Sequence, residues 1–191
     1  MGAIAKGLVL TSATTQTLYT CPAGKSAVVT VSITNAATSG TTAVTPTLAY
    51  ICNGVTTTLA RPSLLPGVCE EIAGIVMPAG AVLTVTGIAS STVHVRLWGF
   101  EEVRAAVAKG TVISSTNAMT IFTCPAGKTT TVTASLYGSA AGTQTLAYVY
   151  GGQTTTLERS GIVLPAGASL IVTSSAANSC YATVYGFEEP E

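Results

Sequence analysis

Apolar and polar residues alternate along several short stretches of the chain. In one of them, Val29, Val31 and Ile33 are separated by Thr30 and Ser32. A later stretch with the same alternation reads Val93, His94, Val95, Arg96, Leu97, Trp98. Because successive side chains of a β-strand point to opposite faces, both stretches predict strands with one face in a core.

The same criterion predicts about eight short strands in the first half of the chain, and no segment combines a helical period with helix caps. The expected strands cover residues 4–10, 16–21, 26–35, 45–52, 55–59, 72–76, 82–88 and 93–100. Short strands joined by regular turns are typical of an all-β fold.

The second half of the chain repeats the first. Residues 3–7 (AIAKG) match 106–110 (AVAKG), and TCPAGK occurs at both 20–25 and 123–128, each at an offset of 103. The later matches are TTTL at 56–59 and 154–157 (offset 98), GIVMPAG at 74–80 with GIVLPAG at 161–167, and WGFEE at 98–102 with YGFEE at 185–189 (both at offset 87). This self-similarity predicts a tandem duplication, with one domain at 1–104 and a second at 105–191.

The falling offset indicates two insertions in the first repeat. The drop from 103 to 98 places 5 extra residues in the 35–46 loop, and the drop from 98 to 87 places 11 more around 62–73. Insertions of this kind lie in loops, and loops often carry function.

The tripeptide Pro-Ala-Gly recurs four times between predicted strands, at Pro22, Pro78, Pro125 and Pro165. Proline presets φ for a turn, and the glycine accepts a positive φ two residues later. These tripeptides predict type I turns followed by a bulge, each closing a hairpin.

Eight strands in roughly 90 residues with regular turns fit a β-sandwich, most simply a jelly roll. The predicted fold class is all-β, with two tandem homologous, jelly-roll-like β-sandwich domains of about eight strands each. In the second domain, Cys180, Ala182 and Val184 should face the core, and Tyr181 and Tyr185 should face the other way.

Charged residues are scarce throughout the pattern. The chain of 191 residues has 8 Lys and Arg, 8 Glu and no Asp, so charged residues make up 8%. A net charge of zero without basic runs argues against a nucleic-acid partner. No apolar run reaches the roughly 18 residues of a membrane helix, so no membrane partner is expected. A surface of Thr, Ser, Ala and Gly costs little to desolvate, which suits packing against other proteins.

The start of the chain could pass for a weak signal peptide, because Lys6 precedes the apolar residues 8–10. Its counterpart, Lys109 before Val112 and Ile113, lies in mid-chain. Both segments are therefore interpreted as first strands, and no export signal is expected.

Few residues offer catalytic or metal-binding chemistry. His94 is the single histidine, and a chain without Asp cannot form a Ser-His-Asp triad. The cysteines lack CxxC spacing and lie at Cys21, Cys52, Cys69, Cys124 and Cys180. We expect His94 on a surface or interface, Cys180 as a small apolar core residue, and reduced thiols, with Cys52–Cys69 as the one pairing considered.

Paired carboxylates occur at 101–102 and 188–189, but neighbours on a strand point to opposite faces and cannot converge on one substrate. Glu70 and Glu71 lie in the second insertion, where a solvated loop is expected and a weak cation site is the alternative. Gly151-Gly152 is interpreted as a hairpin turn rather than a phosphate cradle.

Three aromatic residues, Trp98, Tyr181 and Tyr185, are expected on outer strand faces, where they could form a glycan-stacking patch. Such residues more often pack under a loop or at a subunit interface. The expectation is that the chain is not an enzyme and has no catalytic, cofactor or metal site.

Each copy reads a strand, an aromatic residue followed by Thr-Cys-Pro-Ala-Gly-Lys, a Val-rich strand, a later Pro-Ala-Gly-Ala, and a closing aromatic-Gly-Phe-Glu-Glu. This order resembles the small β-sandwich virion proteins of tailed bacteriophages, among them capsid decoration (cement), collar and tail-attached proteins. The residues that carry the resemblance, 22–25 and 99–102 with their counterparts, are turn and strand-end residues that carry structure rather than catalysis.

The resemblance implies a capsid decoration protein that binds the outer capsid surface and stabilises the shell. Its expected partners are the major capsid protein and further copies of itself, as a homotrimer. Its expected location is the virion, assembled in the host cytoplasm. Two alternatives remain: a neck, tail or fibre-anchoring subunit that binds other neck or tail proteins, and a glycan-binding module that aids host attachment.

Overall fold

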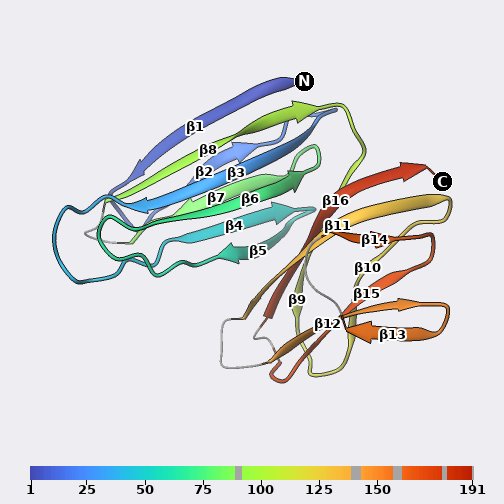
Figure 1. Ribbon diagram of the computed structural model, residues 1–191. Helices are drawn as coiled ribbons and strands as arrows, with labels where there is room; N and C mark the ends of the chain where they lie inside the picture. Colours follow the sequence, from blue (N-terminus) through green and yellow to red (C-terminus); the bar gives the residue numbers. More distant parts are fainter. Residues whose placement is uncertain (89–91, 139–142, 157–160, 178–179, 191) are drawn as a thin grey trace. The chain divides into compact units, whose positions relative to one another are not determined.

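The computed structural model describes residues 1–88, 92–138, 143–156, 161–177 and 180–190 (Figure 1). These residues form sixteen β-strands, which confirms the all-β prediction. Within the described part of the chain, no helix is long and apolar enough to span a membrane. Leu157, which the sequence comparison pairs with Leu59, lies outside the described residues.

The chain forms two compact units. The first contains Met1–Ile51 and Ala60–Arg104, and the second contains Cys52–Leu59 and Ala105–Glu191. Residues 52–59 group with the second compact unit although they belong to the first sequence repeat, and the boundary at residue 104 stays a prediction from the repeats. Contacts across a chain are set by packing, which a boundary drawn from sequence repeats does not take into account.

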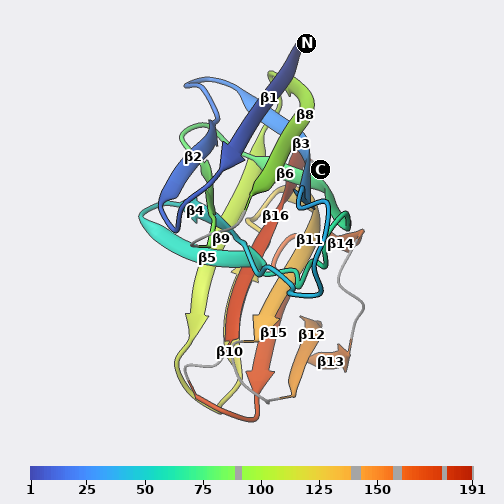
Figure 2. The same ribbon diagram turned by 90° about the vertical axis from the view of Figure 1, so that its left-hand side faces the viewer.

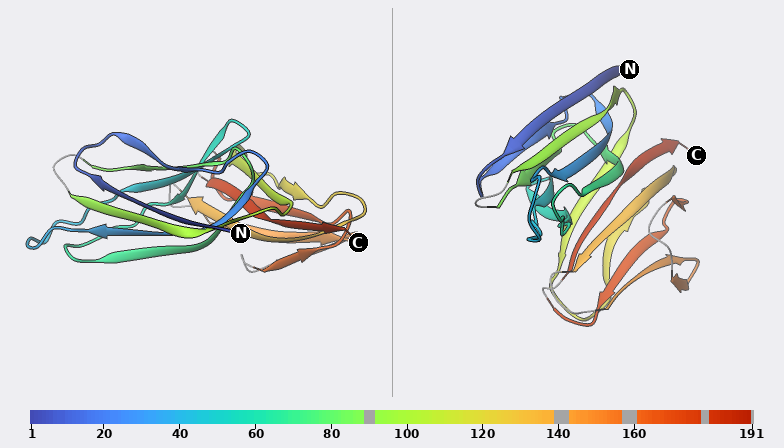
Figure 3. Two further views of the ribbon diagram at one scale, coloured as in Figure 1. Left: turned by 90° about the horizontal axis from the view of Figure 1, so that it is seen from above. Right: turned by 60° about the vertical axis from the view of Figure 1, so that its left-hand side comes forward.

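The first sequence repeat forms two antiparallel sheets. One has the order β1 (Gly2–Leu10), β8 (Val93–Glu102), β3 (Ser26–Asn35), β6 (Cys69–Met77). The other has the order β2 (Thr15–Thr20), β7 (Val82–Thr86), β4 (Thr47–Cys52), β5 (Val55–Ala60). The N-terminal strand (blue in Figure 3) lies at the edge of its sheet, next to β8.

The second unit repeats this arrangement. Its first sheet has the order β9 (Ala106–Ile113), β16 (Cys180–Pro190), β11 (Lys128–Gly138), β14 (Ile162–Leu164). Its second sheet has the order β10 (Met119–Thr123), β15 (Ser169–Ser174), β12 (Gln144–Tyr150), β13 (Gln153–Thr156). Figure 2 shows β9, β16 and β11 side by side.

Both sets of eight strands have jelly-roll topology. Counted within a repeat, the strands fall into one sheet in the order 1-8-3-6 and into another in the order 2-7-4-5. Successive strands therefore lie in opposite sheets, except for the fourth and fifth, which are neighbours in one sheet, and this is the arrangement of an eight-stranded jelly roll. The predicted class of two tandem jelly-roll-like sandwiches is confirmed.

The inward faces are the predicted ones. Val29, Val31 and Ile33 are buried on β3, and Val95 and Leu97 are buried on β8. In the second unit the buried cluster includes residues from both sheets, such as Ile113, Val132, Leu164, Leu170 and Cys180. Alternation with period two was sufficient to identify these faces because each sheet buries one side against the other.

The prediction that the Pro-Ala-Gly turns close hairpins is wrong. These turns connect strands of different sheets. The first lies between β2 and β3, which belong to different sheets. The Lys25 N–H donates to the Pro22 carbonyl over 3.3 Å, so proline is the first turn residue, and Gly24 is third with φ 70°. A positive φ at the third position is what a type II turn requires.

Two short turns do join neighbouring strands. Asn53 and Gly54, between β4 and β5, have φ of 51° and 77°, and Gly151 and Gly152, between β12 and β13, have φ of 57° and 79°. Positive φ at both central residues is the signature of a type I′ hairpin turn. The predicted hairpin at Gly151-Gly152 is confirmed.

A glycine on the last strand of each repeat allows close contact with the neighbouring strand. A Cβ atom at Gly99 would overlap the Val28 carbonyl oxygen and lie 2.8 Å from the Val29 Cα. A Cβ at Gly186 would overlap the Thr131 carbonyl oxygen in the same way. The obstructing atoms belong to the backbone, so they cannot move aside without distorting the sheet.

We predict that Gly99→Ala, and separately Gly186→Ala, lowers the free energy of unfolding of the affected unit by at least about 2 kcal/mol, because the added methyl group must displace backbone atoms. Urea unfolding followed by circular dichroism measures the loss. Gly2→Ala is the matched control, because its Cβ would meet no atom closer than 3.9 Å. If all three variants unfold at the same urea concentration, the close contact does not constrain these positions.

Candidate functional site

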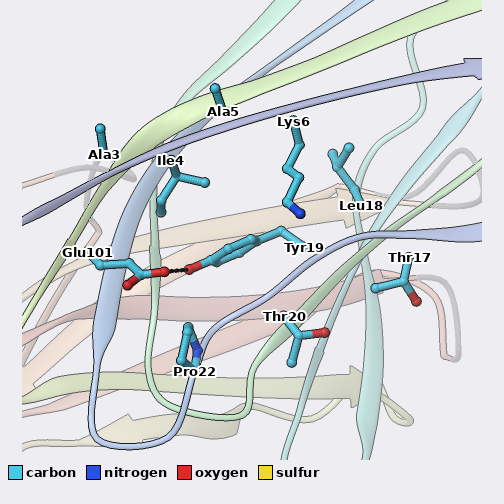
Figure 4. Close-up of a pocket in the computed structure, with 10 residues that line it drawn as sticks. All are labelled: Ala3, Ile4, Ala5, Lys6, Thr17, Leu18, Tyr19, Thr20, Pro22 and Glu101. Atoms are coloured by element: carbon cyan, nitrogen blue, oxygen red, sulfur yellow. Dashed lines mark hydrogen bonds between the residues drawn. The ribbon is translucent and has the colours of Figure 1, made fainter.

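A groove on the first unit lies between the edge strands β1 and β2 of its two sheets (Figure 4). Its volume is about 570 Å³, and ten residues line it, from Ala3 to Lys6, from Thr17 to Thr20, with Pro22 and Glu101. Figure 4 shows Ile4 and Lys6 pointing from β1 toward Tyr19, whereas Ala3 and Ala5 point away.

The groove contains one polar pair. The Tyr19 hydroxyl donates to Glu101 Oε1 over 2.8 Å, and Tyr19 is buried. The second unit has Phe122 at the position of Tyr19, while Glu188 matches Glu101, so the pair is a property of the first unit alone. The sequence indicated Glu101 as a strand-end residue and gave no prediction of this bond, although the change from Tyr to Phe between the copies is visible in it.

The environment keeps the Tyr19 hydroxyl protonated. Burial raises the pKa of Tyr19 well above its ordinary value of 10, and the neighbouring Glu101 carboxylate raises the pKa further. A protonated hydroxyl that donates to a carboxylate is neither a base nor a nucleophile. The pair therefore fixes the strand end that carries Glu101 against β2 rather than performing chemistry.

The two insertions of the first repeat form one ordered structure, which we call the insertion cap (residues 36–46 and 62–68). Val44 and Leu64 exchange two backbone hydrogen bonds of 2.8 and 2.9 Å. Buried Asn35 holds the cap in place: its side-chain amide donates to the Leu64 carbonyl over 3.0 Å, and its backbone bonds Gly67 and Val68. A hollow of about 480 Å³ is lined by the first part of the cap together with Pro66, Ile88 and Thr92.

The cap revises the expectation for residues 62–73. Only the first part of this stretch is a loop, because β6 begins at Cys69 and includes Glu70 and Glu71. These two carboxylates are exposed, but they lie on a strand rather than in a solvated loop. Glu70 pairs with Ile33 and Glu71 with Ser32, so the pairing of β3 with β6 is longer than the equivalent pairing of β11 with β14 in the second unit.

His94, Arg96 and Trp98 lie on the outer face of β8, as the alternation predicts, and all three are exposed. Arg96 and Trp98 are paired with Gly7 and Ala5 of β1. Together with Lys6 and Leu97, these residues line a shallow hollow of about 430 Å³.

The second unit departs from the expected exposure of its aromatic residues. Tyr185 is only 6% exposed, and burial raises the pKa of its hydroxyl, whereas Trp98 at the equivalent position of the first unit is 41% exposed. Thr183, next to Tyr185 on the same face of β16, is fully buried. Tyr185 is thus packed under another part of the chain, which is the arrangement favoured for these aromatic residues, and the alternative of a glycan patch formed by Trp98, Tyr181 and Tyr185 loses this residue.

All five cysteines are free thiols. The considered Cys52–Cys69 pairing is therefore wrong: the Cys52 thiol donates to the Ala108 carbonyl over 3.5 Å, and exposed Cys69 lies 3.0 Å from the Ser32 hydroxyl. Burial raises the pKa of Cys21 and of Cys52, so both remain protonated and poorly nucleophilic.

Reactive groups do not gather elsewhere in the described part of the chain. Among those residues, no three His, Cys, Asp or Glu side chains are placed to hold a metal ion. The features that distinguish the first unit are its groove, its insertion cap and its uncovered outer face, all of which are surfaces rather than reactive centres.

A scan of protein-family models finds no match, and a search of curated proteins finds none either. Among solved structures, the STIV MCP is similar with a TM-score of 0.32 and 13% identity, covering 97% of this chain and 96% of that one. The exported protein XepA of PBSX is similar with a TM-score of 0.37 and 11% identity (98% and 86% covered). A structure of Sulfolobus Turreted Icosahedral Virus gives 0.36 and 10% (98% and 90%). Because these TM-scores and identities are low, the likenesses do not bear on function.

We predict that Tyr19→Phe lowers the free energy of unfolding by about 1 kcal/mol, because Glu101 loses its donor while the ring remains in place. Urea unfolding at pH 7 measures the change. Tyr150→Phe is the control, because Tyr150 is half-exposed at a strand end. Equal losses in the two variants would show that the bond to Glu101 contributes nothing.

Stability should also fall in alkaline solution. The pKa values of Tyr19 and Tyr185 are raised in the folded state, so above pH 10 the unfolded chain releases protons that the folded chain retains. Below pH 10, neither tyrosine makes the free energy of unfolding depend on pH. Above pH 10, each tyrosine lowers the free energy of unfolding by up to about 1.4 kcal/mol per pH unit, until the pH reaches the pKa of that tyrosine in the folded state. Urea unfolding between pH 8 and pH 11 tests this, and Tyr19→Phe should show the shallower decline; identical declines would contradict it.

Proposed function

We propose that the chain is a virion structural protein, and specifically a capsid decoration protein that binds the outer capsid surface and stabilises the shell. The observation that carries the proposal is that the distinctive features of the chain are low-charge surfaces on two rigid jelly rolls. Such surfaces suit lasting contact with other proteins, because few ions must be desolvated on binding. The assignment to a virion rests on the resemblance of both copies to small tailed-phage virion proteins.

The second unit supports a packing role for surfaces of this composition. The outer face of β16 there is covered, with Thr183 and Tyr185 buried. A face rich in Thr, Ala and Gly therefore packs against protein within this chain itself. The equivalent face of the first unit, on β1 and β8, is left uncovered and carries His94, Arg96 and Trp98.

The insertion cap is the surface that we propose contacts the capsid. Leu65 and Val68 are exposed large apolar residues, and the backbone between them is held by the bonds to Asn35. A loop already fixed in one conformation loses little conformational entropy on binding, so its apolar side chains contribute more affinity. The sequence of the second repeat lacks both insertions, which favours the first unit as the capsid-binding half.

Mixing purified protein with expanded, undecorated capsids of the virus that encodes it tests this proposal. We expect stoichiometric binding and a gain in the heat resistance of the shell, with many modest contacts adding up. The double variant Leu65→Ser, Val68→Ser should bind at least about tenfold more weakly, because two apolar contacts are lost. Val163→Ser, an exposed apolar residue of β14 in the second unit, is the matched control. No stoichiometric binding by the wild-type chain would refute the decoration role.

Copy number in purified particles distinguishes the decoration role from a neck, tail or fibre-anchoring subunit. The resemblance implies hundreds of copies for a decoration protein and few for a tail component. Quantitative mass spectrometry against the major capsid protein gives the ratio, and a ratio of a few copies per particle would favour the neck or tail alternative.

A further inference from the structure

One sheet face of the second unit is covered by a segment far away in the sequence. Segment 52–59 belongs to this unit, and its Thr57 is fully buried. Thr183 on β16 donates to the Thr57 hydroxyl over 2.6 Å, and the Cys52 thiol donates to the Ala108 carbonyl of β9 over 3.5 Å. The outer face of β9 and β16 is thus an occupied docking face.

Gly110 of β9 is required by this contact. A Cβ atom at Gly110 would lie 2.8 Å from Thr57 Cγ2 and 3.3 Å from Val55 Cγ1. A larger residue would push the covering segment away from the face. A glycine inside a strand often marks such a close approach of another segment.

The first unit has the same glycine without the covering segment. Gly7 matches Gly110, but a Cβ at Gly7 would meet nothing closer than the Val95 carbonyl oxygen at 4.0 Å. Its φ lies outside the left-handed region, so its backbone does not demand glycine either. Glycine weakens a strand interior, and nothing within the first unit compensates for that cost.

The surface around Gly7 is an open counterpart of the occupied face. We call it the open docking face (Ala5, Gly7, Arg96 and Trp98), and these residues line the shallow hollow of about 430 Å³, together with Lys6 and Leu97, which lie between them on the two strands. By the repeat offsets, Gly7 corresponds to Gly110, Arg96 to Thr183 and Trp98 to Tyr185.

The covering segment is duplicated as well. Residues 56–59 and 154–157 both read TTTL, and each follows a type I′ turn. In the second unit the three threonines of this sequence lie on β13, the edge strand of its sheet, where Gln153 and Thr154 are exposed; Leu157 lies outside the described residues. Segment 52–59 already lies on the face of β9 and β16. The equivalent segment, β13, and the equivalent face, the open docking face, remain available for binding.

We propose that the chain binds a second copy of itself head to tail, with β13 of one copy on the open docking face of the next. The contact repeats the way segment 52–59 lies on β9 and β16. Both sides have become more polar than in the occupied contact, since Gln153 replaces Val55 and Arg96 replaces Thr183. Polar surfaces of this kind suit contacts between copies that must also remain soluble alone.

The contact joins two different surfaces, so each bound copy leaves one β13 and one docking face free. Repetition then gives a closed ring if the rotation between copies closes, and an open filament if it does not. This inference goes beyond the proposed function, because it concerns binding between copies and holds whether or not the chain binds a capsid.

The mass in solution tests the proposal. Sedimentation or light scattering with a reducing agent should show association of the wild-type chain at concentrations up to about 300 µM, within the range of weak protein contacts. Gly7→Val should weaken association at least about tenfold, because its side chain fills the hollow without meeting its own unit. Gln153→Arg should do the same, because it places a cation opposite Arg96.

Matched controls separate docking from folding. Ala3→Val lies on the same face of β1 outside the hollow, and Thr154→Arg lies next to Gln153 on the opposite strand face. Both should associate as the wild type does, and none of the four variants should have a lower urea midpoint than the wild type. A monomeric wild type at every concentration, or a Gly7→Val variant that associates normally, overturns the proposal.

A mixture of the two blocked variants gives the sharpest result. Gly7→Val retains a functional β13, and Gln153→Arg retains a functional docking face. Together they should form a one-to-one dimer and nothing larger, because each partner supplies one intact surface. A mixture that remains monomeric, or that forms larger assemblies, contradicts head-to-tail binding through these surfaces.

Discussion

Each unit depends on burying one face of its central strand. β8 lies between β1 and β3, and β16 lies between β9 and β11, and both direct alternate apolar side chains between the two sheets. Charged residues make up only 8% of the chain, so apolar burial, rather than ion pairing, must supply most of the stabilisation. Gly99 and Gly186 belong to the same constraint, because the neighbouring backbone occupies the space that a side chain there would need.

Local rules explain what the sequence could predict. The alternation around Val29 and Val95 identifies the core faces because the period of a strand depends on its own backbone alone. The turn at Pro22 was placed correctly but given the wrong role, because turn residues set a local conformation and not which sheet the chain enters next. The burial of Tyr185 could not be predicted because it depends on a contact between distant parts of the sequence. Thr57, which lies against the same face, is 126 residues away from its partner Thr183.

The candidate surfaces were only partly visible in the sequence. The offsets located both insertions, but they gave no sign that Val44 and Leu64 would pair and join them into one cap. The bond between Tyr19 and Glu101 could have been suspected from Phe122, the one aromatic change next to a conserved turn of the repeat. Differences between the two copies thus point to surfaces, whereas their shared residues point to the core and the turns. In a duplicated chain the two repeats can be compared with each other. A residue that differs between them is not required by the fold that both share.

The distribution of the thiols has a practical consequence. Cys69 is exposed on β6, and the other four cysteines are buried. Because thiol reagents need an accessible, ionisable sulfur, a maleimide probe should attach at one position of the native chain without any engineered cysteine. A heavy-atom cluster or a fluorophore on Cys69 would then mark the first jelly roll of every copy in an electron micrograph or an energy-transfer measurement. The native chain is in this sense already prepared for single-site labelling.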